Sequence, residues 1–256
     1  MKIALLVAYD GTDFHGFARQ THARTVQGEL ESRLSLLLRA PIETVGAGRT
    51  DAGVHAAGQV VSFDAPSSVL PEWLKLRLNK LLAPEIVVRA AAEVPDDFSA
   101  RFSATRREYE YRIYRSPEPD PFRDRFALWV PGPLSITNMR AAARALIGEQ
   151  DFSSFCRRGE GSMVRRIRSI SFAPRQDELI VRIKADSFCH QMVRSIVGLL
   201  LEVGAGKREP GDARKALRAK HRNAAGPVAA ARGLHLVAVG YRPSPFERVD
   251  PTPSRR

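Results

Sequence analysis

The feature that most constrains the fold of this 256-residue chain is an order of short apolar segments that occurs twice along it. In the first hundred residues, β-branched runs typical of strands alternate with leucine repeats typical of helices. Thr25 and Pro71 stand where a helix N-cap and a first helical residue are expected. The order is strand, helix, strand, strand, helix, strand, predicted at residues 2–9, 25–38, 42–47, 57–64, 71–82 and 86–93.

The second part of the chain repeats this order, with an extra short helix predicted at 212–219. Its other elements are predicted at residues 106–115, 135–147, 166–173, 178–185, 190–205 and 234–241. Two ferredoxin-like α+β units follow from the repeat, at residues 1–100 and 101–242. Each would form an antiparallel sheet with helices on one face and leave the other face to its counterpart or a ligand. Residues 243–256 are rich in proline and predict a mobile tail.

The two parts of the chain differ strongly in net charge. Residues 1–100 hold 10 basic and 12 acidic residues, a net charge of −2, whereas residues 101–256 hold 30 basic and 16 acidic residues, a net charge of +14. Such a positive field attracts polyanions, and nucleic acid is the leading candidate partner because lysine and arginine displace its counterions. The alternative is a basic protein without such a partner. A membrane is not expected, because no apolar run approaches the roughly 20 residues of a spanning helix.

Cysteine and histidine usage predicts neither disulfides nor a bound metal. Cys156 and Cys189 are the only cysteines, and they form no CxxC pair, so a disulfide framework is improbable in a chain of this size. The apolar run at residues 3–8 is too short for a signal peptide. A cytoplasmic location is therefore expected. The six histidines show no metal-ligand spacing.

Residues 46–55, with the sequence GAGRTDAGVH, have the character of a reactive loop. Three glycines, an acid and a histidine stand between the strand-like runs at 43–45 and 59–63. The glycines allow positive φ and close approach of another backbone, so Asp51 can be presented to a bulky ligand at a sharp turn. Asp51 is then a nucleophile, a base or an ion-paired turn residue, and ordinary turns are also rich in Asp and Gly.

This loop, with Gly58 and the three residues after it, resembles the active-site loop of the TruA-type tRNA pseudouridine synthases. Further segments resemble other parts of that family in the same order, at residues 9–16, 25–27, 95–104, 109–111, 151–155, 192–198 and 233–236. The similarity extends to about residue 241. Three positions depart from the family pattern: Phe17 stands where Trp is usual, 189–191 replaces a more basic run, and 224–232 is rich in alanine.

The resemblance implies both a fold and an activity. The fold would be that of pseudouridine synthases, with the two antiparallel sheets joined around a central RNA-binding cleft. The activity would be isomerisation of uridine to pseudouridine at positions 38, 39 and 40 in the anticodon stem-loop of tRNA, by a homodimer. The reaction leaves atoms and redox state unchanged, so no metal or nucleotide cofactor is expected.

The resemblance also assigns roles to four residues. Asp51 would attack C1′ of the ribose or act as a base at C2′. Arg194 would pair with Asp51 and favour its charged form. Arg49 would fill the space left when the uridine leaves its stack, and Tyr109 would stack on the target base. From the residues alone, Tyr109 is equally an aromatic core residue, Arg194 a solvated flank of an apolar helix, and Arg49 a salt-bridge partner of Asp51. Tyr111 is assigned to the core.

Three other classes of function compete with this one. Tandem RNA-recognition motifs share the units and the charge, but the chain lacks their aromatic octamer. A phosphate-binding loop would need the lysine of G-x-x-x-x-G-K-S/T, which residues 46–53 lack. A glycosidase would need two carboxylates such as Asp51 and Asp64, yet Asp64 ends a predicted strand and a basic chain suits a neutral sugar poorly.

Overall fold

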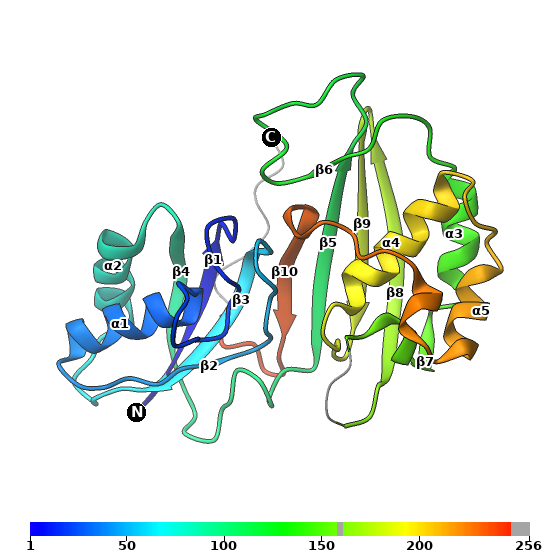
Figure 1. Ribbon diagram of the computed structural model, residues 1–256. Coiled ribbons are helices and arrows are strands. Elements are labelled where there is room, and N and C mark those ends of the chain that lie inside the picture. Colours follow the sequence, from blue (N-terminus) through cyan, green and yellow to red (C-terminus); the bar gives the residue numbers. More distant parts are fainter. Residues whose placement is uncertain (158–160, 247–256) are drawn as a thin grey trace. The chain divides into compact units, whose positions relative to one another are not determined.

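The computed structural model describes residues 1–157 and 161–246, and the chain in it divides into two compact units (Figure 1). The first unit contains Met1–Thr105 and the chain from Leu236 onward, and the second contains Arg106–His235. Both combine helices with mainly antiparallel strands. The predicted α+β class is therefore confirmed.

The first unit is built on four neighbouring strands in the order β4-β1-β3-β10, with the short β2 paired to β3. Its elements are β1 (Lys2–Tyr9), α1 (Val26–Leu38), β2 (Val45–Gly46), β3 (His55–Asp64), α2 (Pro71–Leu82), β4 (Ile86–Val94) and β10 (Leu234–Gly240). Leu6 on β1 lies between Val60 on β3 and Ala90 on β4, and the three share a buried cluster with Ala100 and Tyr241. One face of the sheet is thus covered by the chain segments that follow β4 and β10.

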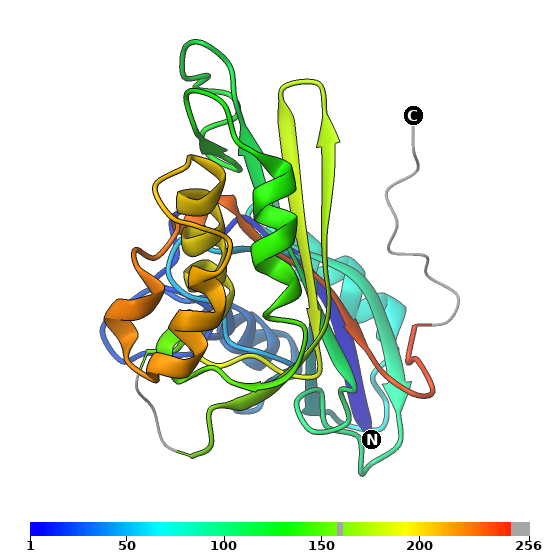
Figure 2. The same ribbon diagram turned by 90° about the vertical axis from the view of Figure 1, so that its right-hand side faces the viewer.

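The second unit has the strand order β5-β9-β8-β7, and β6 runs parallel to β5. Its elements are β5 (Arg106–Tyr114), β6 (Leu128–Trp129), α3 (Ile136–Arg144), β7 (Gly148–Asp151), β8 (Val164–Arg175), β9 (Glu178–Ala185), α4 (Met192–Gly204) and α5 (Asp212–Ala219), with 3-10 turns η1 (Ser153–Phe155), η2 (Arg222–Ala225) and η3 (Ala231–Gly233). Figure 2 shows α3, α4 and α5 on one side of the long strands β8 and β9.

The last strand, β10, lies with the first unit and not with the second unit as the sequence predicts. Residues 101–242 were expected to form one unit, but from Leu236 the chain groups with the first unit, where β10 lies beside β3. Gly58 on β3 makes this possible, because a Cβ there would lie 2.3 Å from the carbonyl oxygen of Val237. The predicted tail at 243–256 lies mostly outside the described residues, which end at 246.

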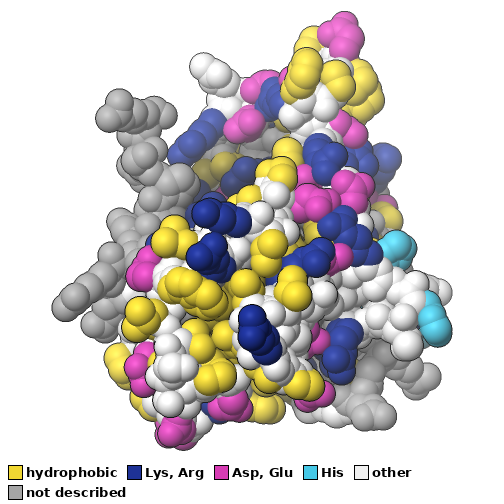
Figure 3. Space-filling model, turned by 90° about the vertical axis from the view of Figure 1, so that its left-hand side faces the viewer, with side chains coloured by type: hydrophobic (Ala, Val, Ile, Leu, Met, Phe, Trp, Pro, Cys, Tyr) yellow, Lys and Arg dark blue, Asp and Glu magenta, His cyan; other side chains and the backbone are white. Residues whose placement is uncertain are grey.

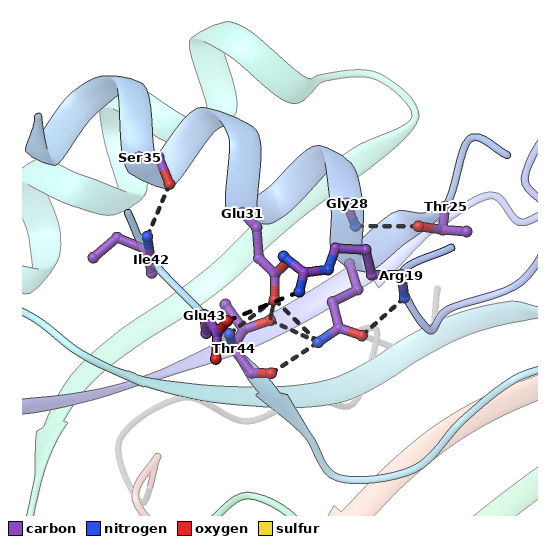
Figure 4. Close-up of polar contacts among 9 residues, drawn as sticks. Arg19, Thr25, Gly28, Glu31, Ser35, Ile42, Glu43 and Thr44 are labelled. Carbon is purple, nitrogen blue, oxygen red and sulfur yellow. Dashed lines mark hydrogen bonds and ion pairs between the residues drawn. The ribbon is translucent and has the colours of Figure 1, made fainter. Parts of the chain in front are cut away.

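The strand predicted at 42–47 is reduced to β2, and a buried polar network explains why (Figure 4). The backbone N–H of Thr44 donates to Glu31 Oε1 at 2.9 Å, and its carbonyl accepts from Gln27 Nε2 at 2.8 Å. Both backbone groups of Thr44 are therefore bonded to side chains of α1, so the ladder begins only at Val45. Arg19 adds an ion pair to Glu31 at 3.3 Å and ties the segment before α1 into the same network.

The two cysteines, expected to be unpaired, are joined in the structure as a disulfide. Their Cα atoms lie 5.7 Å apart, within the range that a disulfide spans. The backbone N–H of Arg157 donates to the carbonyl of His190 at 2.9 Å, which holds the two segments side by side. Sequence reasoning missed the pair because 33 residues separate the two positions and only the fold brings α4 back to η1.

No helix among the described residues is long and apolar enough to cross a membrane.

We expect Glu31→Ala to lower the free energy of unfolding by about 1–3 kcal/mol, because the buried N–H and hydroxyl of Thr44 lose their acceptor. Urea unfolding followed by circular dichroism measures the change. Glu43→Ala is the matched control: this side chain is 86% exposed and also faces Arg19, so its loss should leave the midpoint unchanged. Equal shifts in the two variants would contradict the role given to the network.

Candidate active site

The reactive loop runs from the end of β2 to the start of β3, and Asp51 lies half-buried within it. Its first part is held by the Ala47 N–H, which donates to the Val60 carbonyl at 2.8 Å. Its second part is a tight turn in which the Val54 N–H donates to the Asp51 carbonyl at 3.1 Å. Gly53 has a φ of +75° at this turn, a conformation that favours glycine. The turn therefore fixes the direction in which the chain leaves Asp51.

The segment after β1 holds the loop on both sides of Asp51. The Phe17 N–H donates to the Thr50 carbonyl at 3.0 Å, and the Gly53 N–H donates to the Phe14 carbonyl at 3.3 Å. These bonds are backbone to backbone, so they position the catalytic candidate without depending on side-chain rotamers.

Tyr9, the last residue of β1, adds a side-chain bond to the same loop. Its hydroxyl and that of Thr50 lie 2.8 Å apart and share a hydrogen bond. Burial raises the pKa of Tyr9 to about 12, so the phenol stays neutral at physiological pH.

The backbone of Gly11 packs directly against the end of the loop. A Cβ at this position would lie 1.9 Å from the carbonyl oxygen of Val54. The Gly11 N–H donates to Nδ1 of the buried His55 at 3.1 Å, and Asp10 Oδ1 lies 3.2 Å from the same nitrogen. His55, expected in the loop, is in fact the first residue of β3. The sequence places residues 9–11 only within a segment that resembles the family and gives no sign that they hold the loop.

The glycines of the loop differ in whether a side chain would fit at their positions. At Gly46 the ring of Phe17 occupies the space of a Cβ, with its nearest atom at 2.3 Å. Gly48 has neither a positive φ nor any atom within 4 Å of a built Cβ, so the expectation of close approach is wrong there.

Arg49 is exposed, and within residues 1–157 and 161–246 its guanidinium forms no ion pair. The alternative of a salt bridge to Asp51 is therefore not observed.

Tyr109 lies on β5 of the second unit, on the same face as Tyr111 and Ile113, as the alternation predicts. All three are buried, and Tyr109 is 7% exposed. The Tyr109 ring meets the ring of Phe188 edge to face, with centroids 5.1 Å apart. Tyr111 is part of the core as expected: it donates to the Ala230 carbonyl at 2.8 Å, and burial raises the pKa of its hydroxyl.

Arg194 lies in the first turn of α4, beside the predicted apolar stripe, which is buried. Its Nε donates to the carbonyl of Ala229 at 2.8 Å, and the Ala229 N–H returns a bond to the Arg194 carbonyl at 3.1 Å. This reciprocal pair fixes the plane of the guanidinium, so Arg194 is an oriented side chain and not a loose surface arginine.

The four predicted site residues thus divide between the units. Asp51 and Arg49 share one loop of the first unit, whereas Tyr109 and Arg194 belong to neighbouring elements of the second unit. The pairing of Asp51 with Arg194 stays a prediction. In the described part of the chain no group of three His, Cys, Asp or Glu side chains is placed to hold a metal ion.

Comparison with known proteins gives one consistent result. The family model described as "tRNA pseudouridine synthase" matches residues 5–103 and 142–242. The tRNA pseudouridine synthase A of Halalkalibacterium halodurans is 45% identical over 91% of this chain and 90% of its own length. Proteins of the same name from Bacillus licheniformis and Frankia casuarinae are 43% and 42% identical, over 94% and 99% of this chain and 99% and 98% of their own lengths.

We expect Gly11→Ala to destabilise the first unit by about 1–3 kcal/mol, because its Cβ collides with a backbone oxygen that cannot rotate away. Thermal unfolding measures the effect. Gly48→Ala is the control. Gly48 lies in the loop itself but has open space around it, so this variant should unfold at the wild-type temperature. A wild-type melting temperature for Gly11→Ala would show that the loop is not packed against residue 11.

Proposed function

The chain belongs to the family of tRNA pseudouridine synthases, and on that premise we propose that Asp51 is its catalytic carboxylate. The activity is isomerisation of uridine to pseudouridine in tRNA. The N1–C1′ bond of the nucleoside breaks, the uracil turns, and a C5–C1′ bond forms. The position of Asp51 in a loop that backbone bonds hold on both sides is the observation that carries its assignment.

A fixed carboxylate suits this reaction because the ribose carbon must be reached with little freedom of approach. Asp51 either attacks C1′ or removes the proton at C2′, and both roles need a charged carboxylate at the sugar. The hydrogen bonds at the Thr50 carbonyl and the Gly53 N–H fix the main chain on both sides of Asp51. No step of this chemistry requires a metal or a nucleotide cofactor.

The other three site residues follow from the family pattern. Tyr109 supplies the aromatic platform for the detached base, since an aromatic ring stacks well on uracil. Arg194 orients Asp51 and favours its ionised form. Arg49, exposed and without an ion pair in the described residues, is available to enter the RNA stem when the uridine leaves it. The target uridines are those at positions 38, 39 and 40 of the anticodon stem-loop.

The second unit carries the charge for gripping tRNA. It holds 25 basic and 14 acidic residues, a net charge of +11, against a net charge of +1 for the rest of the chain. Between α3 and β8 lies a hollow of about 310 Å³ flanked by Arg140 and Arg144. Like charges four residues apart on a helix repel, and neither arginine forms an ion pair within the described residues. A phosphate backbone lying in this hollow would relieve that repulsion.

The protein acts as a homodimer in the cytoplasm, where its tRNA substrates are. The outer face of the first unit offers a surface for a second copy, with Leu36 on α1 62% exposed and Leu76 on α2 61% exposed. Trp73 and Leu70 add to this set. Figure 3 shows hydrophobic side chains gathered on the face that α1 and α2 present. Contiguous exposed apolar patches often mark a surface that binds another protein.

Asp51→Asn should abolish turnover while tRNA binding persists, because an amide of the same size neither attacks carbon nor accepts a proton at neutral pH. Incubation with unmodified tRNA and mapping of pseudouridine test this. Asp64→Asn is the control, since the Asp64 side chain is 85% exposed at the end of β3 and should be dispensable. Pseudouridine formation by a folded Asp51→Asn protein would contradict the mechanism, and loss of activity in Asp64→Asn would favour a two-carboxylate reaction.

Replacing Arg140 and Arg144 together with Ala should weaken tRNA binding and reduce the salt slope of the association constant by about one to two. Filter binding at several salt concentrations gives the slope. The control is Arg214→Ala with Arg218→Ala, which removes the same charge at the same spacing from α5. Equal effects of the two pairs would assign binding to the general field and not to the hollow.

Leu36→Glu combined with Leu76→Glu should give a monomer at concentrations where the wild type is a dimer, since buried charges disfavour the interface. Sedimentation velocity measures the mass. Phe122→Glu serves as the control, because Phe122 is 91% exposed on the second unit and outside this surface. A double variant that still sediments as a dimer would place the interface elsewhere.

A further inference from the structure

The disulfide between Cys156 and Cys189 is used by no step of the proposed reaction. Cys156 is 3% exposed and follows η1, and Cys189 is half-buried in the turn before α4. A chain of this size with a large apolar core does not need a covalent staple for stability. Disulfides in reducing compartments are usually transient, either catalytic or redox-sensing.

Cys189 lies close to the segments that hold two of the proposed site residues, Tyr109 and Arg194. The preceding residue, Phe188, has its ring against Tyr109, with centroids 5.1 Å apart. The carbonyl of Cys189 accepts from the N–H of Met192, the first residue of the helix that carries Arg194. The disulfide therefore holds the short segment that connects Phe188, which packs against Tyr109, to the start of α4.

In this linked state Tyr109 has little surface to offer a base. The residue is 7% exposed, and its ring packs edge to face with the ring of Phe188. A residue that stacks on uracil needs an accessible ring face. Phe188 is only partly buried and is the residue next to Cys189, so the disulfide restrains the segment that carries it.

We propose that Cys156 and Cys189 form a reversible thiol–disulfide site that closes the base platform when oxidised and opens it when reduced. The proposal rests on the function proposed for Tyr109. The dithiol form is the active enzyme, and the disulfide form is held closed by Phe188.

The exchange needs a small-molecule thiol and its disulfide as partners. A thiolate of the reductant attacks one sulfur of the protein disulfide, and the other sulfur leaves as a thiolate. A second reductant thiolate then attacks the mixed disulfide. The protein gains two thiols, and two reductant thiols become one disulfide, so electrons and protons balance. Oxidation by a glutathione-type disulfide is the reverse of these steps.

The test compares turnover of the full-length protein after equilibration with oxidised or reduced glutathione. Maleimide labelling and mass spectrometry count the thiols, which should number two in the reduced protein and none in the oxidised protein. Conversion of unmodified tRNA should be slower in the oxidised form by on the order of tenfold or more, as expected when a site residue is held out of position. Dithiothreitol should restore the rate.

Cys156→Ser and Cys189→Ser should convert tRNA at one rate in both buffers, because neither can close the bond. Phe188→Ala should form the disulfide but lose most of the slowing, since the ring that packs edge to face with Tyr109 is gone. This variant separates closure by Phe188 from a general effect of the crosslink on stability.

Equal wild-type rates in the two buffers, a protein that retains two thiols in oxidised glutathione, or slowing of Phe188→Ala as large as that of wild type would each overturn the proposal. Its failure is distinguishable from failure of the catalytic assignment. Asp51→Asn reports on the latter and should be inactive in both buffers, whatever the redox state of the cysteines.

Discussion

The backbone contact between the segment after β1 and the reactive loop is the constraint on which the rest of the site depends. Gly11 lies so close to the carbonyl of Val54 that no side chain fits between them, and Phe14 and Phe17 bond the loop from the same segment. Because these contacts join main chains, they fix the backbone on both sides of Asp51. A reaction at a ribose carbon benefits from such precision, since small displacements of a carboxylate are costly.

A second set of contacts, between α1 and the segment that leads into β2, supports this loop. Glu31, on the buried side of α1, takes both the N–H and the hydroxyl of Thr44 and so determines where β2 begins. The strand then enters the loop at Gly46, against the ring of Phe17. Burying a carboxylate is costly unless it is bonded, and the two hydrogen bonds to Glu31 Oε1 set where the strand that leads to Asp51 begins.

The second unit positions its site residues by different means. Arg194 is oriented through the main chain of Ala229, and Tyr109 through a sheet face and the ring of Phe188. The first unit is nearly neutral and the second is strongly basic, so the net positive charge of the chain lies almost wholly in the second unit. The cysteine pair lies in this same unit, where it holds the segment between Phe188 and α4.

The sequence by itself determined the α+β class, most of the order of the elements, the loop that carries Asp51 and the charge asymmetry, although it did not predict the short strands β6 and β7. These properties are local: periodicity, capping at Thr25, proline at the start of α2 and the density of arginine are all read within short windows. They predicted most helices and strands closely, although α3 ends at Arg144, three residues earlier than expected. The resemblance to a family supplied the roles of Tyr109 and Arg194, which spacing alone left open.

Only the tertiary structure decided which distant segments meet. It grouped β10 with the first unit through the close approach of Val237 to Gly58, and it brought Cys189 back to Cys156. It also placed Gly11 against Val54 and gave both backbone groups of Thr44 to side chains of α1. Each of these contacts joins residues that lie far apart in the sequence, and the local sequence around one residue does not reveal the other. Such contacts contribute free energy only when the whole unit packs.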